Sequence, residues 1–330
     1  MSGGFRGPLF LVGMPRSGTK LLRTMLNRSP AVGIPAVETE FFPYWISRWK
    51  SWGDLSDRRA FTAFYEQVTR LPYFVYQAER ASVIPLEDWY AASAPFTPAA
   101  VFEALIRRDA EAPRSGARIW GDKSPSYIHH LPLLRAHFPE ARFLHIVRDA
   151  RDHAMSMKKA WNKHPLRAAQ RWVDGVETAR RDAATMPDRY LELRYEDLLL
   201  RPEPLLRRCC ELLEIPFDPA MADPGQVTEN LGDAAGLSGL KRDNAEKWRS
   251  QMPERLRLRI ERIAGPTLRS LGYPTEHVGP AERISPTVLR LYQAQDAVGL
   301  VRAELKQRGL LGAVRFRIDT WRVSGNRGVA

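Results

Sequence analysis

The feature that most constrains the fold of this chain is a short apolar run that ends in a glycine-containing loop. Residues 8–13 read Pro-Leu-Phe-Leu-Val-Gly, a continuous apolar segment of the kind that a parallel strand buried on both faces presents. The loop 13–20 follows at once, and Leu21, Leu22, Met25 and Leu26 then repeat at helical spacing. A buried strand that leads through a tight loop into a helix is typical of a parallel α/β sheet.

The same order of strand, polar loop and helix recurs further along the chain. We predict strands at 142–147 and 190–195, each followed by charged residues and a helical pattern, and a further helix from about 253 to 271. Between about 41 and 110 we expect helices and loops, whose many aromatic residues either form core or line an acceptor pocket. The predicted fold class is α/β, with a P-loop-like three-layer domain over 1–278, its central parallel sheet flanked by helices, and a basic amphipathic helical tail over 279–330.

Charge and composition narrow the class of partner. The 330 residues include 50 Lys plus Arg against 38 Asp plus Glu, and the formal net charge of +12 favours an anionic partner. Because no zinc-finger or recognition-helix pattern accompanies this charge, we expect no nucleic acid binding. The two cysteines, Cys209 and Cys210, are adjacent and suit neither a disulfide framework nor a zinc site. No apolar run approaches the ~20 residues that cross a bilayer, so we expect a cytoplasmic protein.

The loop 13–20 has the composition of an anion site. It reads Gly-Met-Pro-Arg-Ser-Gly-Thr-Lys and lies where backbone N–H groups and the positive end of a helix face a ligand. Gly18 lets the backbone approach closely, Ser17 and Thr19 offer hydroxyl groups, and Arg16 or Lys20 supplies the countercharge. A Walker A loop would need Lys at position 19 and Ser or Thr at position 20, whereas this chain has the reverse order. A kinase would therefore lack its phosphate-binding lysine and its magnesium-binding hydroxyl at the expected places.

Several blocks together resemble sulfotransferases that use 3'-phosphoadenosine 5'-phosphosulfate (PAPS). Residues 15–19 resemble the 5'-phosphosulfate loop of that family, and Arg148 with Ser156 in the block 148–156 resembles its 3'-phosphate site. Residues 121–127 and 194–198 also match, and Lys247 with the following Trp is similar to a late basic loop that closes over the nucleotide. The resemblance covers roughly residues 8–275 and implies PAPS as the donor and PAP as the product.

The resemblance also implies a role for each matching residue. The residues expected to bind the nucleotide are Arg16, Ser17, Gly18, Thr19, Lys20, Arg148, Ser156, Tyr195 and Lys247. Arg148 and Ser156 would bind the 3'-phosphate, and Tyr195 would lie on the adenine side. Arg16 would also stabilise the leaving oxygen, and Lys123 would reach the sulfuryl oxygens as a point charge. Lys20 departs from the family pattern, which usually has a second Thr or Ser at that position.

The catalytic base is also implied by a resemblance. Residues 38–42 read Glu-Thr-Glu-Phe-Phe and resemble the Glu-x-x-Phe-Phe element that carries the catalytic carboxylate in the glycan and tyrosylprotein-like branch of the family. Glu38 is the predicted general base, with Glu40 as the alternative. Members that use a histidine base place it where this chain has Pro125, but His129 and His130 are close by, so a histidine base stays open. No cluster with metal-ligand spacing accompanies these residues, so we expect transfer without a metal ion.

We therefore expect an enzyme that moves the sulfuryl group from PAPS, by in-line transfer, to a hydroxyl on a glycan, a glycolipid or a glycosylated natural product. Two other functions stay open: a P-loop phosphotransferase that uses ATP and Mg²⁺, and a non-catalytic nucleotide-binding protein. The tail 279–330 combines basic residues with an apolar stripe. It either packs on the domain, forms a homodimer with a second copy or lies on an anionic membrane.

Overall fold

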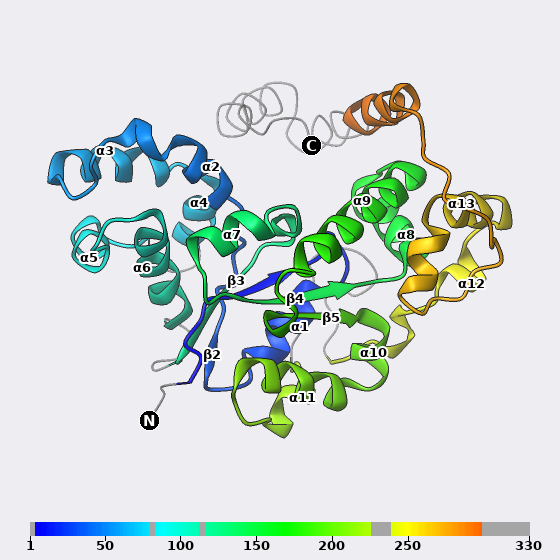
Figure 1. Cartoon of the computed structure of the whole chain (residues 1–330), viewed down its shortest axis with the longest axis horizontal. Coiled ribbons are helices and arrows are strands. Elements are labelled where there is room, and N and C mark those ends of the chain that lie inside the picture. The colour runs from blue at the N-terminus through cyan, green and yellow to red at the C-terminus, as the bar shows by residue number, and fades with distance from the viewer. Residues whose placement is uncertain (1–3, 80–82, 112–116, 226–238, 299–330) are drawn as a thin grey trace.

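The computed structural model describes residues 4–79, 83–111, 117–225 and 239–298. Within them, a parallel sheet has the strand order β2-β3-β1-β4-β5 (Figure 1). Its strands are β1 (Leu9–Val12), β2 (Val32–Gly33), β3 (Ile119–Lys123), β4 (Arg142–Val147) and β5 (Tyr190–Arg194). The predicted strands β1, β4 and β5 are confirmed to within one residue at each end.

The apolar pattern misses β2 and β3 for two different physical reasons. β2 has only two residues, which is too short for any periodic signal. β3 is buried throughout, but it reads Ile-Trp-Gly-Asp-Lys, so Asp122 and Lys123 interrupt the apolar run by which a buried strand is recognised. Charged residues are rarely buried without a partner or a function. Their burial at the carboxyl end of β3 therefore indicates a functional site there.

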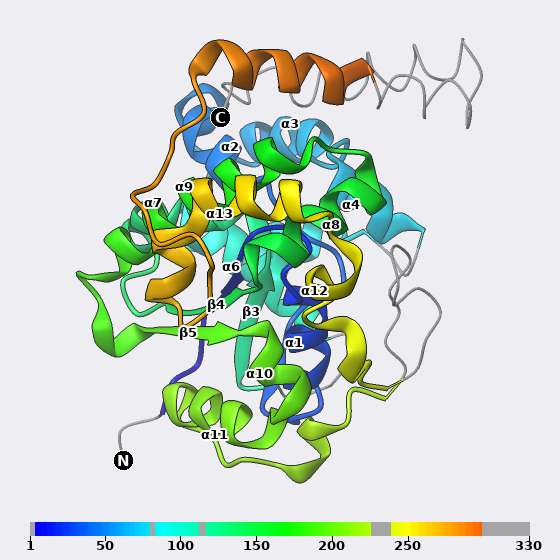
Figure 2. The same cartoon turned by 90° about the vertical axis from the view of Figure 1, so that its right-hand side faces the viewer.

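Helices cover both faces of the sheet, so the predicted three-layer architecture is confirmed (Figure 2). The α-helices are α1 (Thr19–Leu26), α2 (Phe42–Arg48), α3 (Arg58–Val68), α4 (Pro72–Ala78), α5 (Leu86–Ala92), α6 (Pro98–Glu111), α7 (Leu131–His137), α8 (Ala150–Trp161), α9 (Pro165–Ala183), α10 (Tyr195–Leu200), α11 (Pro202–Leu213), α12 (Trp248–Gln251) and α13 (Glu254–Ser270). Short 3-10 helices are η1 (Trp49–Trp52), η2 (Pro125–His129), η3 (Pro187–Arg189), η4 (Pro219–Ala222) and η5 (Arg242–Asn244). Among the described residues, no helix combines the length and apolar composition needed to cross a membrane.

Each face of the sheet has its own hydrophobic core. Leu9 and Leu11 of β1 point to the core under α1, α10 and α11, whereas Phe10 points to the core under α8, α9 and the aromatic helices α2 to α6. This alternation follows from the two-residue period of a strand. Trp45 and Trp89 of the aromatic segment are fully buried, so much of that segment is core.

The chain returns to the body of the protein at residues 286–298, which are helical. The buried Asp296 accepts hydrogen bonds from the backbone N–H of His164 and from Nη1 of Arg167, both at 2.7 Å. The ring of Tyr292 stacks on His164 with their centroids 3.5 Å apart. This helix is thus attached to the corner between α8 and α9. Residues 299–330 lie outside the described residues, and the division of the chain at 278 stays a prediction.

A buried ion network joins α8 to α13. Arg151 is fully buried, and its guanidinium donates to Asp149 Oδ2 at 2.6 Å and to Glu261 Oε1 at 2.7 Å. The same guanidinium lies over the ring of Trp248, 3.5 Å from its centroid. Two carboxylates of separate helical segments therefore depend on one cation.

We expect Arg151→Ala to lower the free energy of unfolding by about 3–5 kcal/mol, because it leaves two buried carboxylates without their cation. Urea unfolding followed by circular dichroism measures the loss. Arg207→Ala is the control, since Arg207 pairs with Glu203 on the surface of α11 and should change stability by less than about 1 kcal/mol. Equal effects of the two substitutions would contradict the prediction.

Candidate functional site

A cavity of about 870 Å³ opens at the carboxyl ends of the central strands. Its wall combines the loop after β1, Glu38 and Glu40, one face of α8, Tyr195 at the start of α10, and residues of the segment 239–256. Ligands of open parallel sheets bind at this edge, where the chain turns from one side of a strand to the other. β1 is that strand here, because β3 and β4 pair with its two edges.

The loop after β1 presents the beginning of a helix to the cavity. The backbone N–H of Ser17 donates to Met14 O at 3.1 Å and closes the turn, and α1 begins at Thr19. The first N–H groups of a helix have no acceptor within the helix and carry its positive dipole end. Ser17 Oγ is buried and has no hydrogen-bond partner within the described residues. The loop therefore has unused donor capacity of the kind that a bound anion satisfies.

Gly18 is required by both the backbone and a neighbour. Its φ of 98° lies in the left-handed region, which other residues seldom adopt. A Cβ atom at this position would also collide with the ring of Tyr195, from the start of α10. The tyrosine and the loop thus fit together only because residue 18 has no side chain.

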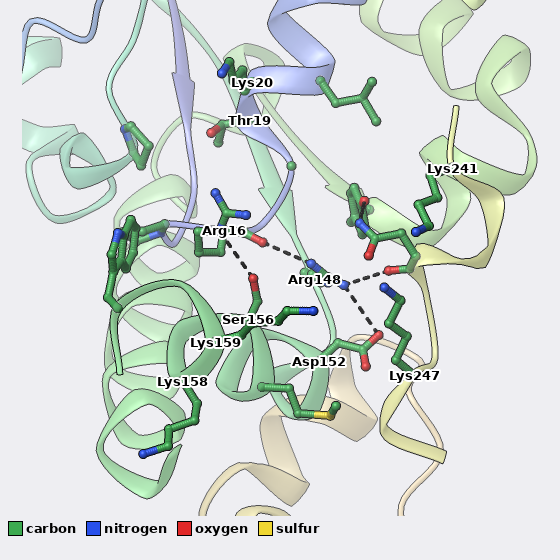
Figure 3. A pocket seen from close by; sticks show the side chains of 18 of the residues that line it. Arg16, Thr19, Lys20, Arg148, Asp152, Ser156, Lys158, Lys159, Lys241 and Lys247 are labelled. Carbon is green, nitrogen blue, oxygen red and sulfur yellow. Dashed lines mark hydrogen bonds and ion pairs between the residues drawn. The ribbon is translucent and has the colours of Figure 1, made fainter. Parts of the chain in front are cut away.

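Arg148 lies at the centre of a cluster drawn from distant parts of the chain (Figure 3). Its Nη2 donates to Asn244 O at 2.7 Å, its Nη1 to Arg16 O at 3.5 Å, and its guanidinium lies 4.7 Å from the ring centroid of Tyr195. Arg16 Nε donates in turn to Ser156 Oγ at 3.3 Å. Arg148 Nε is buried and has no hydrogen-bond partner within the described residues. The structure therefore brings the predicted residues of both phosphate sites into one cluster.

The cavity is strongly basic. Its basic residues are Arg16, Lys20, Arg148, Lys158, Lys159, Lys241 and Lys247, whereas its carboxylates are Glu38, Glu40 and Asp152. Partial burial and the positive charges of Lys241 and Arg148 lower the pKa of Lys247. A lysine whose charge is disfavoured by its neighbours is stabilised when an anion binds. The electrostatics thus favour a multiply charged anionic ligand.

Glu38 lines the cavity and is paired with Lys123. The Glu38 side chain is 40% exposed. Its Oε1 accepts a hydrogen bond from Nζ of Lys123 and forms an ion pair with it, and the Lys123 side chain is only 3% exposed. Glu40 also lines the cavity, and its φ of 51° turns the backbone between the two carboxylates. Glu38 thus presents a carboxylate to the cavity while a buried lysine holds it.

The histidines named by the sequence lie elsewhere. Neither His129 nor His130 lines the cavity, and burial lowers the pKa of both. Another histidine, His153 of α8, is fully buried, and burial together with the charges of Arg148, Arg171 and Arg16 lowers its pKa to about 3. These positions favour a carboxylate over a histidine as the base.

Most of the predicted site residues meet at the cavity. Those that line it are Arg16, Gly18, Thr19, Lys20, Glu38, Arg148, Ser156, Tyr195 and Lys247. Ser17 lies in the same loop but does not line the cavity, and Lys123 reaches it through Glu38. Asp152 and Lys159 also line the cavity but were not predicted. They recur with Ser156 at helical spacing on one face of α8, and that spacing is the signal in the sequence that could have found them.

Two further residues that line the cavity are exposed aromatics. Tyr76 of α4 is 53% exposed and Trp161 at the end of α8 is 37% exposed. No group of three or more His, Cys, Asp or Glu residues in the described part of the chain is arranged to hold a metal ion. Transfer without a metal ion stays a prediction.

Comparisons with known proteins agree with this geometry. A family model described as the sulfotransferase family matches residues 8–219. Protein-tyrosine sulfotransferase 1 of Danio rerio is 26% identical over 306 residues, which cover 85% of this chain and 76% of the relative. Carbohydrate sulfotransferase 3 of Mus musculus is 31% identical over 102 residues, which cover 30% of this chain and 22% of the relative. The solved sulfotransferase domain of the Synechococcus PCC 7002 olefin synthase shares the fold with a TM-score of 0.53 and 24% identity, over 83% of this chain and 98% of that domain.

We expect Gly18→Ala to weaken the binding of inorganic pyrophosphate at least tenfold, because the new methyl group displaces Tyr195 and the loop beside it. Titration calorimetry measures the affinity. Gly53→Ala is the matched control: Gly53 also has a positive φ, of 75°, but no atom lies within 4 Å of its Cβ position. The control should keep the wild-type affinity, and a Gly18 variant that did so too would contradict the prediction.

Proposed function

The chain belongs to the sulfotransferase family, and from that membership we propose that it transfers a sulfuryl group from PAPS to an acceptor hydroxyl. The observation that carries the proposal is the meeting of Arg16, Arg148 and Ser156 beside the start of α1, with Glu38, paired with the buried Lys123, at the same cavity. PAPS carries anionic groups at both its 5' and 3' ends. A basic cavity with two anion-binding parts suits such a donor.

The residues of the cavity fit the nucleotide in charge, size and hydrogen-bonding capacity. A volume of about 870 Å³ lies in the range of ~300–1,000 Å³ that small-molecule sites occupy. Ser17 Oγ and Arg148 Nε are buried donors without a protein partner among the described residues. We assign the 5'-phosphosulfate to the loop 16–20, the 3'-phosphate to Arg148 and Ser156, and the adenine side to Tyr195. Lys247 would add charge from the late basic segment.

Glu38 is proposed to act as the general base. As the acceptor oxygen bonds to sulfur and the bond from sulfur to the 5'-phosphate oxygen breaks, Glu38 takes the proton of the acceptor hydroxyl. PAPS supplies the sulfuryl group and the leaving phosphate. Lys123 and Arg16 supply fixed positive charge where negative charge develops on the oxygens. The ion pair with Lys123 also orients the Glu38 carboxylate before the acceptor binds.

We propose a carbohydrate-type acceptor, on a glycan, a glycolipid or a glycosylated natural product. Tyr76 and Trp161 support this because exposed aromatic faces at a cavity suit sugar rings. A tyrosyl hydroxyl is the second candidate, since the relative that aligns with 85% of this chain is named a protein-tyrosine sulfotransferase. The cytoplasmic location, and homodimer or membrane contacts of the tail, stay predictions.

The kinase alternative is disfavoured by the start of α1. Thr19 and Lys20 occupy the first two positions of the helix, and both line the cavity in the order opposite to a Walker A loop. The carboxylate that Glu38 presents to the cavity favours an enzyme over a non-catalytic nucleotide-binding protein, because a carboxylate beside a bound anion adds no affinity for it.

We expect 3',5'-ADP to raise the melting temperature more than equal concentrations of 5'-ADP or of ATP with Mg²⁺, because at equal concentration the ligand that binds more tightly stabilises the folded protein more. Differential scanning fluorimetry makes the comparison without an acceptor. Arg148→Ala should remove most of the preference for 3',5'-ADP over 5'-ADP, since only the first has a 3'-phosphate. A wild-type preference for ATP with Mg²⁺ would replace this proposal with the kinase.

We expect Glu38→Gln to lower kcat by about 10²–10⁴-fold, because Gln accepts the Lys123 hydrogen bond but no proton. Transfer from labelled PAPS to an accepted sugar or tyrosyl compound measures kcat, and calorimetry with 3',5'-ADP should show an affinity within about twofold of wild type. Glu40→Gln is the matched control and should lower kcat by less than about fivefold. A loss in the Glu40 variant alone would move the base to Glu40.

A further inference from the structure

A set of buried hydroxyl groups connects the segment that carries Glu38 to the end of β3. Thr39 Oγ1 donates to Asp122 Oδ2 at 2.8 Å and lies 2.7 Å from the hydroxyl of Tyr127 and 3.2 Å from that of Ser124. All four residues are buried. Thr39 therefore points into the protein, while its neighbour Glu38 lines the cavity.

The backbone of the same segment is held from the same side. The N–H of Glu40 donates to Ser124 Oγ at 3.1 Å, and the N–H of Phe42 donates to the Tyr127 hydroxyl oxygen at 3.0 Å. Two amides and one side chain thus tie residues 39–42 to the strand end and to η2. The position of Glu38 depends on these ties, because it precedes Thr39 directly.

The hydrogen bonds have a defined direction that ends at a carboxylate. Because the Tyr127 oxygen accepts from Phe42 N–H, its own proton is left to donate to Thr39 Oγ1. The hydroxyl of Thr39 then donates to Asp122 Oδ2. An ionised carboxylate only accepts, so it suits the end of this chain, and a hydrogen bond to it is roughly twice as strong as one between neutral groups. A protonated Asp122 is neutral and carries a donor of its own, so the hydrogen bond that it accepts from Thr39 is weaker.

The charge of Asp122 changes near neutral pH. Burial raises its pKa from the usual 3.8 to about 7, and hydrogen bonds from Thr39 and Ser124 and the charge of Lys123 oppose this rise. The other groups that face it are Glu38, whose charge raises its pKa, and the phenols of Tyr127 and Tyr73, whose pKa values burial raises well above 10.

We propose that Asp122 is a positioning residue for the transfer reaction: it holds Thr39, and Thr39 holds the backbone from which Glu38 reaches the cavity. The proposal rests on the proposed role of Glu38 as the base. Within the described residues, Asp122 is not among those that line the cavity, so it acts through Thr39 and touches neither substrate. Small displacements of a catalytic group are costly, since about 1 Å of misplacement lowers the rate by up to about 100-fold.

A positioning role through the carboxylate has a pH signature. In the wild type, kcat should fall below about pH 7 as Asp122 takes a proton and the hydrogen bond from Thr39 weakens. In Asp122→Asn that limb should disappear, and kcat at pH 8 should be about 10–100-fold lower than in the wild type. The affinity for 3',5'-ADP should stay within about twofold, because the nucleotide residues are untouched.

Stability should change in the opposite direction. The folded protein keeps the Asp122 proton up to about pH 7, whereas the unfolded chain loses it near 3.8, so this group makes the protein less stable as pH rises between those values. Asp122→Asn removes that effect. Its melting temperature relative to wild type should therefore rise from pH 4 to pH 7 and stay raised at pH 8, while kcat falls. A structural role alone would lower both.

Variants of Thr39 test the connection. Thr39→Val removes the hydroxyl and should lower kcat as much as Asp122→Asn does, whereas Thr39→Ser keeps it and should stay within about threefold of wild type. The double variant Asp122→Asn with Thr39→Val should be no slower than either single variant, because both break one connection. Wild-type kcat and pH dependence in either Asp122→Asn or Thr39→Val would overturn the proposal.

Amide hydrogen exchange separates this proposal from the proposed function. In Thr39→Val, and not in Thr39→Ser, the amides of Glu40 and Phe42 should exchange at least tenfold faster, measured by nuclear magnetic resonance without any substrate. Faster exchange in a protein that transfers no sulfuryl group would support the positioning of residues 38–42 and reject the proposed function. Unchanged exchange together with unchanged kcat in an active enzyme would reject the positioning alone.

Discussion

The pairing of β1 with β3 on one edge and β4 on the other determines where almost every part of the site lies. Since all three strands run in one direction, their carboxyl ends meet at one edge, although β1 ends about a hundred residues or more before β3 and β4 in the sequence. The loop before α1, Lys123 and Arg148 each follow or end one of these strands. Both faces of the sheet are covered by helices, so this edge is where these strand ends are open to a ligand. The sheet thus brings together the loop before α1, a buried lysine and an arginine without any long-range motif in the sequence.

The charges of this protein fall into two kinds. The guanidinium of Arg151 is matched within the fold by Asp149 and Glu261, so its charge is neutralised whether or not a ligand is present. The basic groups of the cavity are crowded instead, and partial burial together with the charges of Lys241 and Arg148 lowers the pKa of Lys247. Their arrangement is unfavourable in the free protein and becomes favourable around an anion. The contrast separates the charges that hold the fold from those that face the cavity.

Local pattern was enough for the parts of the fold and the site that depend on neighbouring residues. The runs 8–13 and 142–147 are largely apolar, whereas in 190–195 Leu191 and Leu193 alternate with charged residues, and all three patterns are typical of strands. The loop 13–20 directly follows the first of them. β3 was not predicted because Asp122 and Lys123, which lie next to the site, interrupt its apolar run. The pairing of Thr39 with Asp122 spans 83 residues, and no spacing along the chain records which side chains point toward each other across a fold. The resemblance pointed to Glu38, but only the structure shows which residues hold the segment that carries it.

The attachment of residues 286–298 has a consequence for the wall of the cavity. Asp296 accepts hydrogen bonds from His164 and Arg167, in the corner directly beside Trp161 and Pro165 of the cavity wall. The ring of Trp161 in turn lies under the guanidinium of Arg16, which is 5.9 Å from the ring centroid, so the corner contacts the loop after β1. Residues 286–298 are therefore linked to that loop through Trp161, and the corner between α8 and α9 is the part of the cavity wall whose shape depends on both.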